Sequence, residues 1–233
     1  MGCADSKTAG GGGATIVVEY FGLGYARSDP IRFLLFHANV NHQFVGYDFE
    51  QWGGLKAQGK SGEFDCLPRV TINGQEYGQS MAILRMLGQK YGYYDAQNWR
   101  CAAKVDTLLD AWVDMHDKTN GLALKMTQGG CTQEEAMAEI DGIIESVHVP
   151  ALKAMEEQLS QDGGPYLAGS ELTIADCAFV AMLVNIWENP VGPWSAKFEP
   201  VLKRYPKVQQ YNLKLREAFK ARLGDPNRKP MPI

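Results

Sequence analysis

The chain has 233 residues, a formal net charge of −4 and 45% hydrophobic residues. Its length allows one large domain or two small ones, and its composition is that of an ordinary globular protein. Because no basic stripe is present, a nucleic-acid partner is not expected. The longest apolar stretches fall far short of the roughly 20 residues that a membrane-spanning helix needs, and the N-terminus lacks the apolar region of a secretory signal.

The cysteines and histidines argue against a disulfide framework and against a metal. The five cysteines are odd in number and contain no C-x-x-C pair, which predicts reduced thiols. The four histidines show neither H-E-x-x-H nor H-x-H spacing, so no metal site is expected.

The first structured segments predict a strand and a helix. TIVVEY (15–20) is short and β-branched, which is typical of a strand, and a glycine-containing loop follows it. SDPIRFLLFHANV (28–40) predicts a helix with Ser28 or Asp29 as its N-cap and Pro30 in its first position.

The next segments complete a small mixed sheet. QFVGYDF (43–49) alternates with period 2 and predicts a strand, whereas the glycine-broken segment 50–64 predicts at most a short helix. LPRVTINGQEYG (67–78) predicts a hairpin with Asn73-Gly74 at its turn, and residues 79–92 predict an amphipathic helix. The order β-α-β-β-β-α is that of a thioredoxin-like α/β domain.

From about residue 98 the strand patterns stop, and the pattern predicts helices only. VDTLLDAWVDMHDKTNGLALKM (105–126) predicts a long helix, and the capping box TQEE (132–135) opens another that runs to about Ser160. LTIADCAFVAMLVNIW (172–187) is the most apolar stretch and predicts the central buried helix of a bundle. In it Asp176 is expected to cap the helix and to stabilise the fold.

These patterns predict two domains behind a leader. The expected divisions are a flexible leader, a thioredoxin-like domain, a linker and an all-helical domain that includes a last helix opened by Tyr205-Pro206, at residues 1–14, 15–93, 94–97 and 98–233.

Four segments together carry a family resemblance. They are YFGLGYARSDPIRFLL (20–35), the W-x-x-x-K pattern of Trp52 and Lys56, the LP…NG…QS-x-AI-x-R block and GSELTIADCAF (169–179). Their order and spacing resemble the cytosolic glutathione transferases, nearest to the tyrosine-type classes (alpha, mu, pi and sigma), over residues 15–233. The resemblance implies an enzyme that conjugates glutathione, its co-substrate, to apolar electrophiles in detoxification, with no metal. A glutathione-dependent isomerase (prostaglandin D synthase-like), a peroxidase and a non-catalytic glutathione-binding relative stay open as alternatives.

Such chemistry needs a thiolate at neutral pH. A free thiol has a pKa near 8.5, and lowering it by two units takes about 2.7 kcal/mol. One hydrogen bond to a charged group supplies roughly 1.5–3 kcal/mol, so one hydroxyl suffices for most of the shift. The resemblance implies that Tyr20 is this donor and that Arg27 supports the thiolate electrostatically. Because this chain has one residue more than the family's usual spacing between them, Tyr25 stays a rival.

The resemblance also implies how glutathione is held. The backbone of Leu67, beside an expected cis bond to Pro68, pairs with the cysteinyl part like an added strand. The helix N-terminus at Gln79 and Ser80 receives the γ-glutamyl carboxylate. The indole and the ammonium of the W-x-x-x-K pattern hold the glycyl end. The implied glutathione-binding set is Phe21, Trp52, Lys56, Leu67, Pro68, Gln79, Ser80 and Asp114.

Two features of the site stay open at this stage. Asp114 is expected to reach the glutathione of a neighbouring subunit in a homodimer, with Asp110 and Asp117 as near alternatives. Cys66 stands where the family often has Gln or Asn, and is either a buried inert residue or a reactive thiol.

The second substrate is expected in an apolar cleft between the domains, with candidates Leu23, Tyr25, Met115 and the C-terminal tail.

The leader predicts lipid attachment. MGCADS fits the N-myristoylation pattern M-G-x-x-x-[ST], with Gly2 as the acceptor. One myristoyl chain binds a membrane only marginally, with K about 10⁴ M⁻¹, and the leader has no polybasic patch. Stable anchoring therefore needs a palmitoyl group on Cys3. We expect a cytoplasmic enzyme held at the cytoplasmic face of a membrane, the alternative being an unmodified leader.

Overall fold

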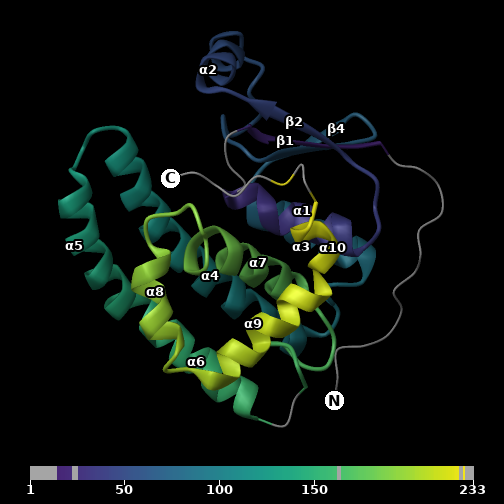
Figure 1. The fold of residues 1–233 in the computed structure, drawn as a ribbon. Helices are drawn as coiled ribbons and strands as arrows, with labels where there is room; N and C mark the ends of the chain where they lie inside the picture. Colours follow the sequence, from purple (N-terminus) through teal and green to yellow (C-terminus); the bar gives the residue numbers. More distant parts are fainter. Residues whose placement is uncertain (1–14, 23–25, 162–163, 226–227, 229–233) are drawn as a thin grey trace.

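The computed structural model describes residues 15–22, 26–161, 164–225 and 228 (Figure 1). In these residues a four-stranded mixed sheet with helices precedes a helical domain, so the expected fold class is confirmed. None of the described helices combines the length and the apolar character that crossing a membrane requires. The leader lies outside the described residues.

The sheet has the strand order β2-β1-β3-β4. β1 runs parallel to β2 and antiparallel to β3, which forms a hairpin with β4. Asn73 and Gly74 take positive φ angles of 51° and 85° at the hairpin turn, which confirms that prediction. A buried ion pair joins two neighbouring strands, because Arg69 Nε lies 2.8 Å from Glu19 Oε2. The four strands span Ile16–Phe21, Gln43–Tyr47, Arg69–Ile72 and Gln75–Tyr77.

The helices of the α/β part are α1 (Asp29–His37), α2 (Phe49–Ala57) and α3 (Ser80–Tyr91), with a 3₁₀ turn at Ala26–Ser28 before α1. α1 begins at Asp29, so Pro30 occupies its second position instead of the expected first. α2 is a full nine-residue helix despite its glycines, because Asp48 and Gln51 form a capping box at its start.

Seven helices make up the described helical domain, and two π-helical turns continue α5 and α7. The capping box at Thr132 and Glu135 is present as predicted. The sequence analysis does not predict α8, which contains Pro200, a residue that disfavours the interior of a helix. Its buried Phe198 stabilises the helix by packing. The elements are α4 (Trp99–Thr127), α5 (Gln133–Ile143), η2 (Ile144–His148), α6 (Val149–Ser160), α7 (Ile174–Met182), η3 (Leu183–Trp187), α8 (Ser195–Leu202), α9 (Pro206–Ala218) and α10 (Lys220–Leu223).

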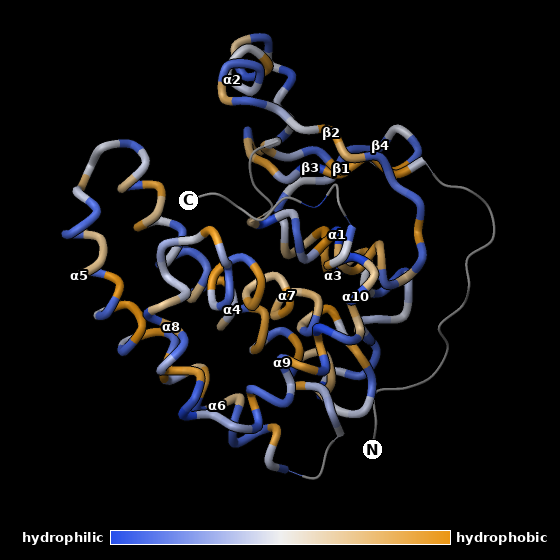
Figure 2. The backbone as a smooth tube through the Cα atoms, in the orientation of Figure 1, coloured by the Kyte–Doolittle hydropathy of each residue, from blue (hydrophilic) through white to orange (hydrophobic). Residues whose placement is uncertain are grey.

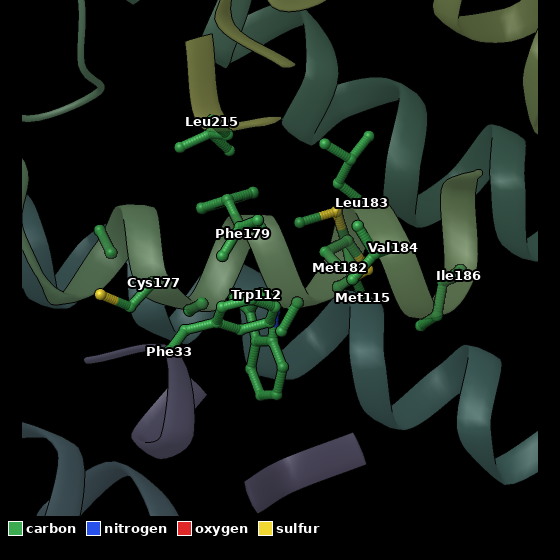
Figure 3. Close-up of a cluster of buried hydrophobic side chains, with 14 of the residues drawn as sticks. Phe33, Trp112, Met115, Cys177, Phe179, Met182, Leu183, Val184, Ile186 and Leu215 are labelled. Atoms are coloured by element: carbon green, nitrogen blue, oxygen red, sulfur yellow. The ribbon is translucent and has the colours of Figure 1, made fainter. Parts of the chain in front are cut away.

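α7 is the centre of the molecule, as the sequence predicts. Every residue of α7 and η3 is buried, and Figure 2 shows α7 between the other helices. The helix contacts α1 and α3 of the α/β part as well as α4 and α9. Phe33 from α1 and Trp112 from α4 pack beside it (Figure 3). Because a fully buried side chain of this kind stabilises by about 1.5–3 kcal/mol, this core holds the two parts of the chain together.

The expected cap at the start of α7 is also present. Asp176 is completely buried, and its carboxylate accepts hydrogen bonds from the backbone N–H of Thr173, at 2.7 Å, and from the hydroxyl of Tyr211, at 2.7 Å. Burial raises the pKa of Asp176, against these hydrogen bonds. Asp176 therefore has the structural role that the sequence predicts for it.

Candidate active site

Tyr20 and Arg27 meet at the edge of the sheet. Tyr20 is near the end of β1, and its side chain is 8% exposed. The backbone N–H of Arg27 donates a hydrogen bond to the Tyr20 hydroxyl oxygen. Burial raises the pKa of Tyr20, while this hydrogen bond and the charge of Arg27 oppose the change. The hydroxyl therefore keeps its proton near neutral pH and is able to donate it to an acceptor.

The cis-proline lies beside Tyr20. The Leu67–Pro68 peptide bond is cis, as predicted. Glu19 of β1 is paired with Arg69 of β3 in an antiparallel register, so the next step along the strands places Tyr20 opposite Pro68. The half-buried Leu67 precedes the first paired residue of β3, which leaves its backbone at the end of the ladder.

The N-terminus of α3 lies close to the same arginine. Gln79 is the N-cap and has φ 68° and ψ 104°, a conformation that non-glycine residues rarely adopt. Ser80 is 5% exposed, and its hydroxyl accepts a hydrogen bond from Arg27 Nη1 at 3.2 Å. Arg27 therefore touches both the catalytic candidate Tyr20 and the helix terminus that is expected to bind a carboxylate.

Arg27 is also paired across the two domains. Its Nη2 donates to both carboxylate oxygens of Asp117, which lies on α4. His116 Nδ1 lies 3.0 Å from Asp117 Oδ1. Partial burial raises the pKa of Asp117, but the hydrogen bond from His116 and the charge of Arg27 hold it below its usual value. Asp117 is therefore a carboxylate at neutral pH.

Asp114 lies elsewhere on α4. Its side chain is exposed, and none of the hydrogen bonds or ion pairs of the described residues includes it. The other alternative, Asp110, pairs with Arg85 at 3.6 Å. Of the three aspartates weighed from the sequence, only Asp117 contacts Arg27. The expectation that Asp114 reaches a second subunit stays a prediction.

The remaining glutathione candidates are on or near α2. Trp52 is buried, while Lys56 is exposed with its Nζ 5.7 Å from the centre of the Trp52 ring. The ring of Phe21 lies between Tyr20 and Phe49, with centroid distances of 5.5 and 5.0 Å. In the described part of the chain, no hydrogen bond or ion pair joins α2 to Arg27, so the roles of Trp52 and Lys56 stay predictions.

The expected cleft for a second substrate is only partly described. Leu23, Tyr25 and most of the C-terminal tail lie outside the described residues. Met115 is 1% exposed and packs in the core instead of lining an open cleft (Figure 3). A small cavity near Arg27, with a volume of about 10 Å³, is bordered by Ala26, His116 and Asn185. It has room for about one water molecule.

Three cysteines agree with the expectation of reduced thiols. Cys66, Cys131 and Cys177 are free, with Cys177 buried and the other two half-buried. Among the described residues no three His, Cys, Asp or Glu side chains are grouped so that they could hold a metal ion.

Sequence reasoning missed His116 and weighed Asp117 only as an alternative. A signal was present in DAWVDMHD (110–117), because Trp112 and His116 are four residues apart and share a helix face. Asp117 follows at the edge of that face. With its cis-proline, its mixed sheet and its helical domain, the chain has the thioredoxin-like fold with a helical extension.

Comparison with known proteins names the family. A family model described as "Glutathione S-transferase, C-terminal domain" matches residues 116–222. The human protein named Glutathione S-transferase A3 is 32% identical over 173 residues, which cover 73% of this chain and 73% of the relative. This chain therefore belongs to the glutathione S-transferase family.

Solved structures share the fold. The structure titled prostaglandin synthase D of Nilaparvata lugens has a TM-score of 0.73 at 19% identity and covers 93% of this chain and 100% of its own. A glutathione S-transferase of the hookworm Necator americanus, titled monomeric Na-GST-3, has a TM-score of 0.72 at 20% identity and covers 92% of this chain and 98% of its own.

Proposed function

We propose that this protein is a glutathione transferase of the tyrosine type, which conjugates the glutathione thiolate to apolar electrophiles. One observation carries the proposal: the backbone N–H of Arg27 contacts the hydroxyl of Tyr20, and the guanidinium of the same residue contacts the hydroxyl of Ser80. Arg27 thus links the candidate hydrogen-bond donor to the thiolate with the candidate receptor of the carboxylate. Family membership supports the same activity.

In this proposal Tyr20 stabilises the thiolate of glutathione. Its oxygen accepts from the backbone of Arg27, so its own proton is available for the sulfur. The hydrogen bond favours the anion and lowers the thiol pKa. The positive charge of Arg27 acts in the same direction. The thiolate then attacks the electrophilic carbon, the new C–S bond forms, and the leaving group takes its electron pair.

Glutathione is held along the sheet and at the start of α3. The backbone of Leu67, next to the cis bond to Pro68, pairs with the cysteinyl unit. Gln79 and Ser80 receive the γ-glutamyl carboxylate, where the positive φ of Gln79 supports a functional backbone conformation. Trp52 and Lys56 hold the glycyl end, and Phe21 lies between the thiol site and α2.

The test is conjugation of glutathione to a general aromatic electrophile by the wild type, Tyr20→Phe and Tyr25→Phe. Loss of one hydrogen bond to an anion, roughly 1.5–3 kcal/mol, predicts a fall of about 10- to 150-fold in kcat/KM for Tyr20→Phe. Tyr25→Phe is expected to stay within about threefold of the wild type. The reverse result would transfer the role to Tyr25, and no turnover despite glutathione binding would reject the transferase activity.

We also propose a homodimer in which Asp114 faces the glutathione of the partner subunit. Two exposed aromatic side chains support an interface, since Phe64 is 56% exposed and Tyr77 37%, and both border one pocket. Sedimentation should give a mass near twice that of the chain. Asp114→Asn should raise the KM for glutathione severalfold, and a monomer with full activity would contradict the shared site.

For localisation we propose a cytoplasmic enzyme anchored by its leader, with myristate on Gly2 and palmitate on Cys3. The support is the sequence pattern alone, and both residues lie outside the described residues. Intact mass of the protein isolated from its own cells tests the proposal. Two added acyl chains are expected, and an unmodified or merely acetylated N-terminus would refute it.

A further inference from the structure

We propose that His116 is a positioning residue for glutathione binding: its ring holds the carboxylate of Asp117 against Arg27, and this fixes the guanidinium beside the Ser80 hydroxyl. The inference rests on the proposed function, because Arg27 has its role only if glutathione binds beside it. It adds a buried residue of α4 to a site that is built mostly by the α/β domain.

The hydrogen bond fixes which nitrogen of the ring carries a proton. His116 Nδ1 lies 3.0 Å from Asp117 Oδ1. A carboxylate only accepts, so Nδ1 has to donate. Burial lowers the pKa of His116, although the contact with Asp117 opposes the change, so the ring is neutral near pH 7. His116 is therefore the Nδ1–H tautomer, with no proton on Nε2.

The ring is rigidly placed, whereas the groups that it holds are not. His116 is 4% exposed and stacks on the buried Trp112, with ring centres 4.6 Å apart and planes 19° apart. The side chains of Arg27 and Asp117 are 29% and 48% exposed. A solvent-exposed ion pair holds its geometry poorly, because ordering two long side chains costs entropy. A buried donor on one partner reduces the orientations that the pair can adopt.

The two terminal nitrogens of the Arg27 guanidinium contact different residues. Both oxygens of Asp117 accept from Nη2, and Oδ1 also accepts from His116. Nη1 remains directed at the Ser80 hydroxyl, 3.2 Å away. When His116 cannot donate, Asp117 is free to rotate toward solvent and Arg27 loses its fixed position. Glutathione then binds to a site that has to be ordered first, so its KM rises.

Substitutions that differ only in the donor test the idea. In His116→Asn, Nδ2 takes the place of Nδ1 and keeps a donor there, whereas His116→Leu has similar bulk and no donor. We expect His116→Leu to lower kcat/KM for glutathione about tenfold, mainly through KM, and His116→Asn to stay within about threefold of the wild type. Equal losses in the two variants would overturn the inference, whatever their thermal stabilities.

A double-mutant cycle separates positioning from packing. If His116 acts through Asp117, then adding His116→Leu to Asp117→Asn should cost less than about twofold. A further tenfold loss in that background would mean that the ring acts through the core, and would overturn the inference. A wild type that neither binds nor turns over glutathione overturns the proposed function and this inference with it.

The tautomer is measurable without any turnover. In ¹⁵N-histidine-labelled protein at pH 7, the His116 ring, assigned from its loss in His116→Leu, should show a protonated Nδ1 and an unprotonated Nε2. The opposite tautomer overturns the inference even if the enzyme is fully active.

Discussion

His148 is expected to make folding sensitive to mild acid. Its side chain is completely buried, and burial lowers its pKa to about 3. Trp187 Nε1 donates to Nδ1 at 3.1 Å, and Nε2 lies 2.8 Å from the hydroxyl of Thr119. A neutral ring satisfies both contacts. A second proton on Nδ1 would face the indole N–H, donor against donor.

The size of the effect follows from the two pKa values. The unfolded chain has an ordinary histidine with a pKa near 6.5, and the folded protein has one near 3. As the pH falls below 6.5, the unfolded state takes up the proton first, so the free energy of unfolding decreases. The contribution of His148 is complete above pH 6.5. Its loss amounts to about 2 kcal/mol at pH 5 and about 3 kcal/mol at pH 4.

The assay is urea denaturation between pH 7 and 4.5 at one protein concentration. In His148→Asn, Oδ1 can accept from Trp187, but nothing titrates. The difference between the free energies of unfolding of the wild type and this variant should shrink by about 2 kcal/mol from pH 7 to 5. Thr119→Val is the control, because it disturbs the same hydrogen-bonded group and keeps the titrating ring. A difference that stays constant within about 0.5 kcal/mol would refute the reasoning.

Four further substitutions probe the packing and the buried charges by denaturant unfolding. In Gly88→Ala the new Cβ would lie 2.5 Å from Cγ2 of Ile174, so we expect a loss of about 1–3 kcal/mol. Gly121→Ala, where nothing lies within 4 Å, should instead gain up to about 1 kcal/mol. Arg69→Met leaves the buried carboxylate of Glu19 without its ion-pair partner. It should lower the free energy of unfolding by about 3–5 kcal/mol, and a loss below about 1 kcal/mol would contradict this. Asp176→Ala should cost about 2–4 kcal/mol through unpaired donors, yet change the KM for glutathione less than twofold, since Asp176 has no contact with the site.

Strong local signals predicted most of the elements. The Asn73-Gly74 turn and the capping box at Thr132 each depend on residues within four positions, so neighbours along the chain decide them. Because α7 is apolar on all sides, its sequence predicts that it lies in the interior of the molecule. The cis bond before Pro68 was expected from family resemblance, because local sequence does not specify it.

Short helices are the elements that the sequence predicts least well. α8 has eight residues with Pro200 among them, and α2 has two adjacent glycines. Such segments have little helical preference of their own, so burial of Phe198 or a cap at Asp48 decides their structure. Local pattern underestimates them for this reason.

By itself the sequence determined the strands, the long helices, the apolar face of each and the residue types from which a thiolate site can be built. Only the tertiary structure decided which aspartate Arg27 uses. Asp110, Asp114 and Asp117 recur at helical spacing on one exposed side of α4, and local pattern does not distinguish them. Arg27 and Asp117 are 90 positions apart in the chain. The rotation of α4 about its axis brings Asp117 to that arginine and turns His116 inward, and that rotation is set by the packing of Trp112 beside α7.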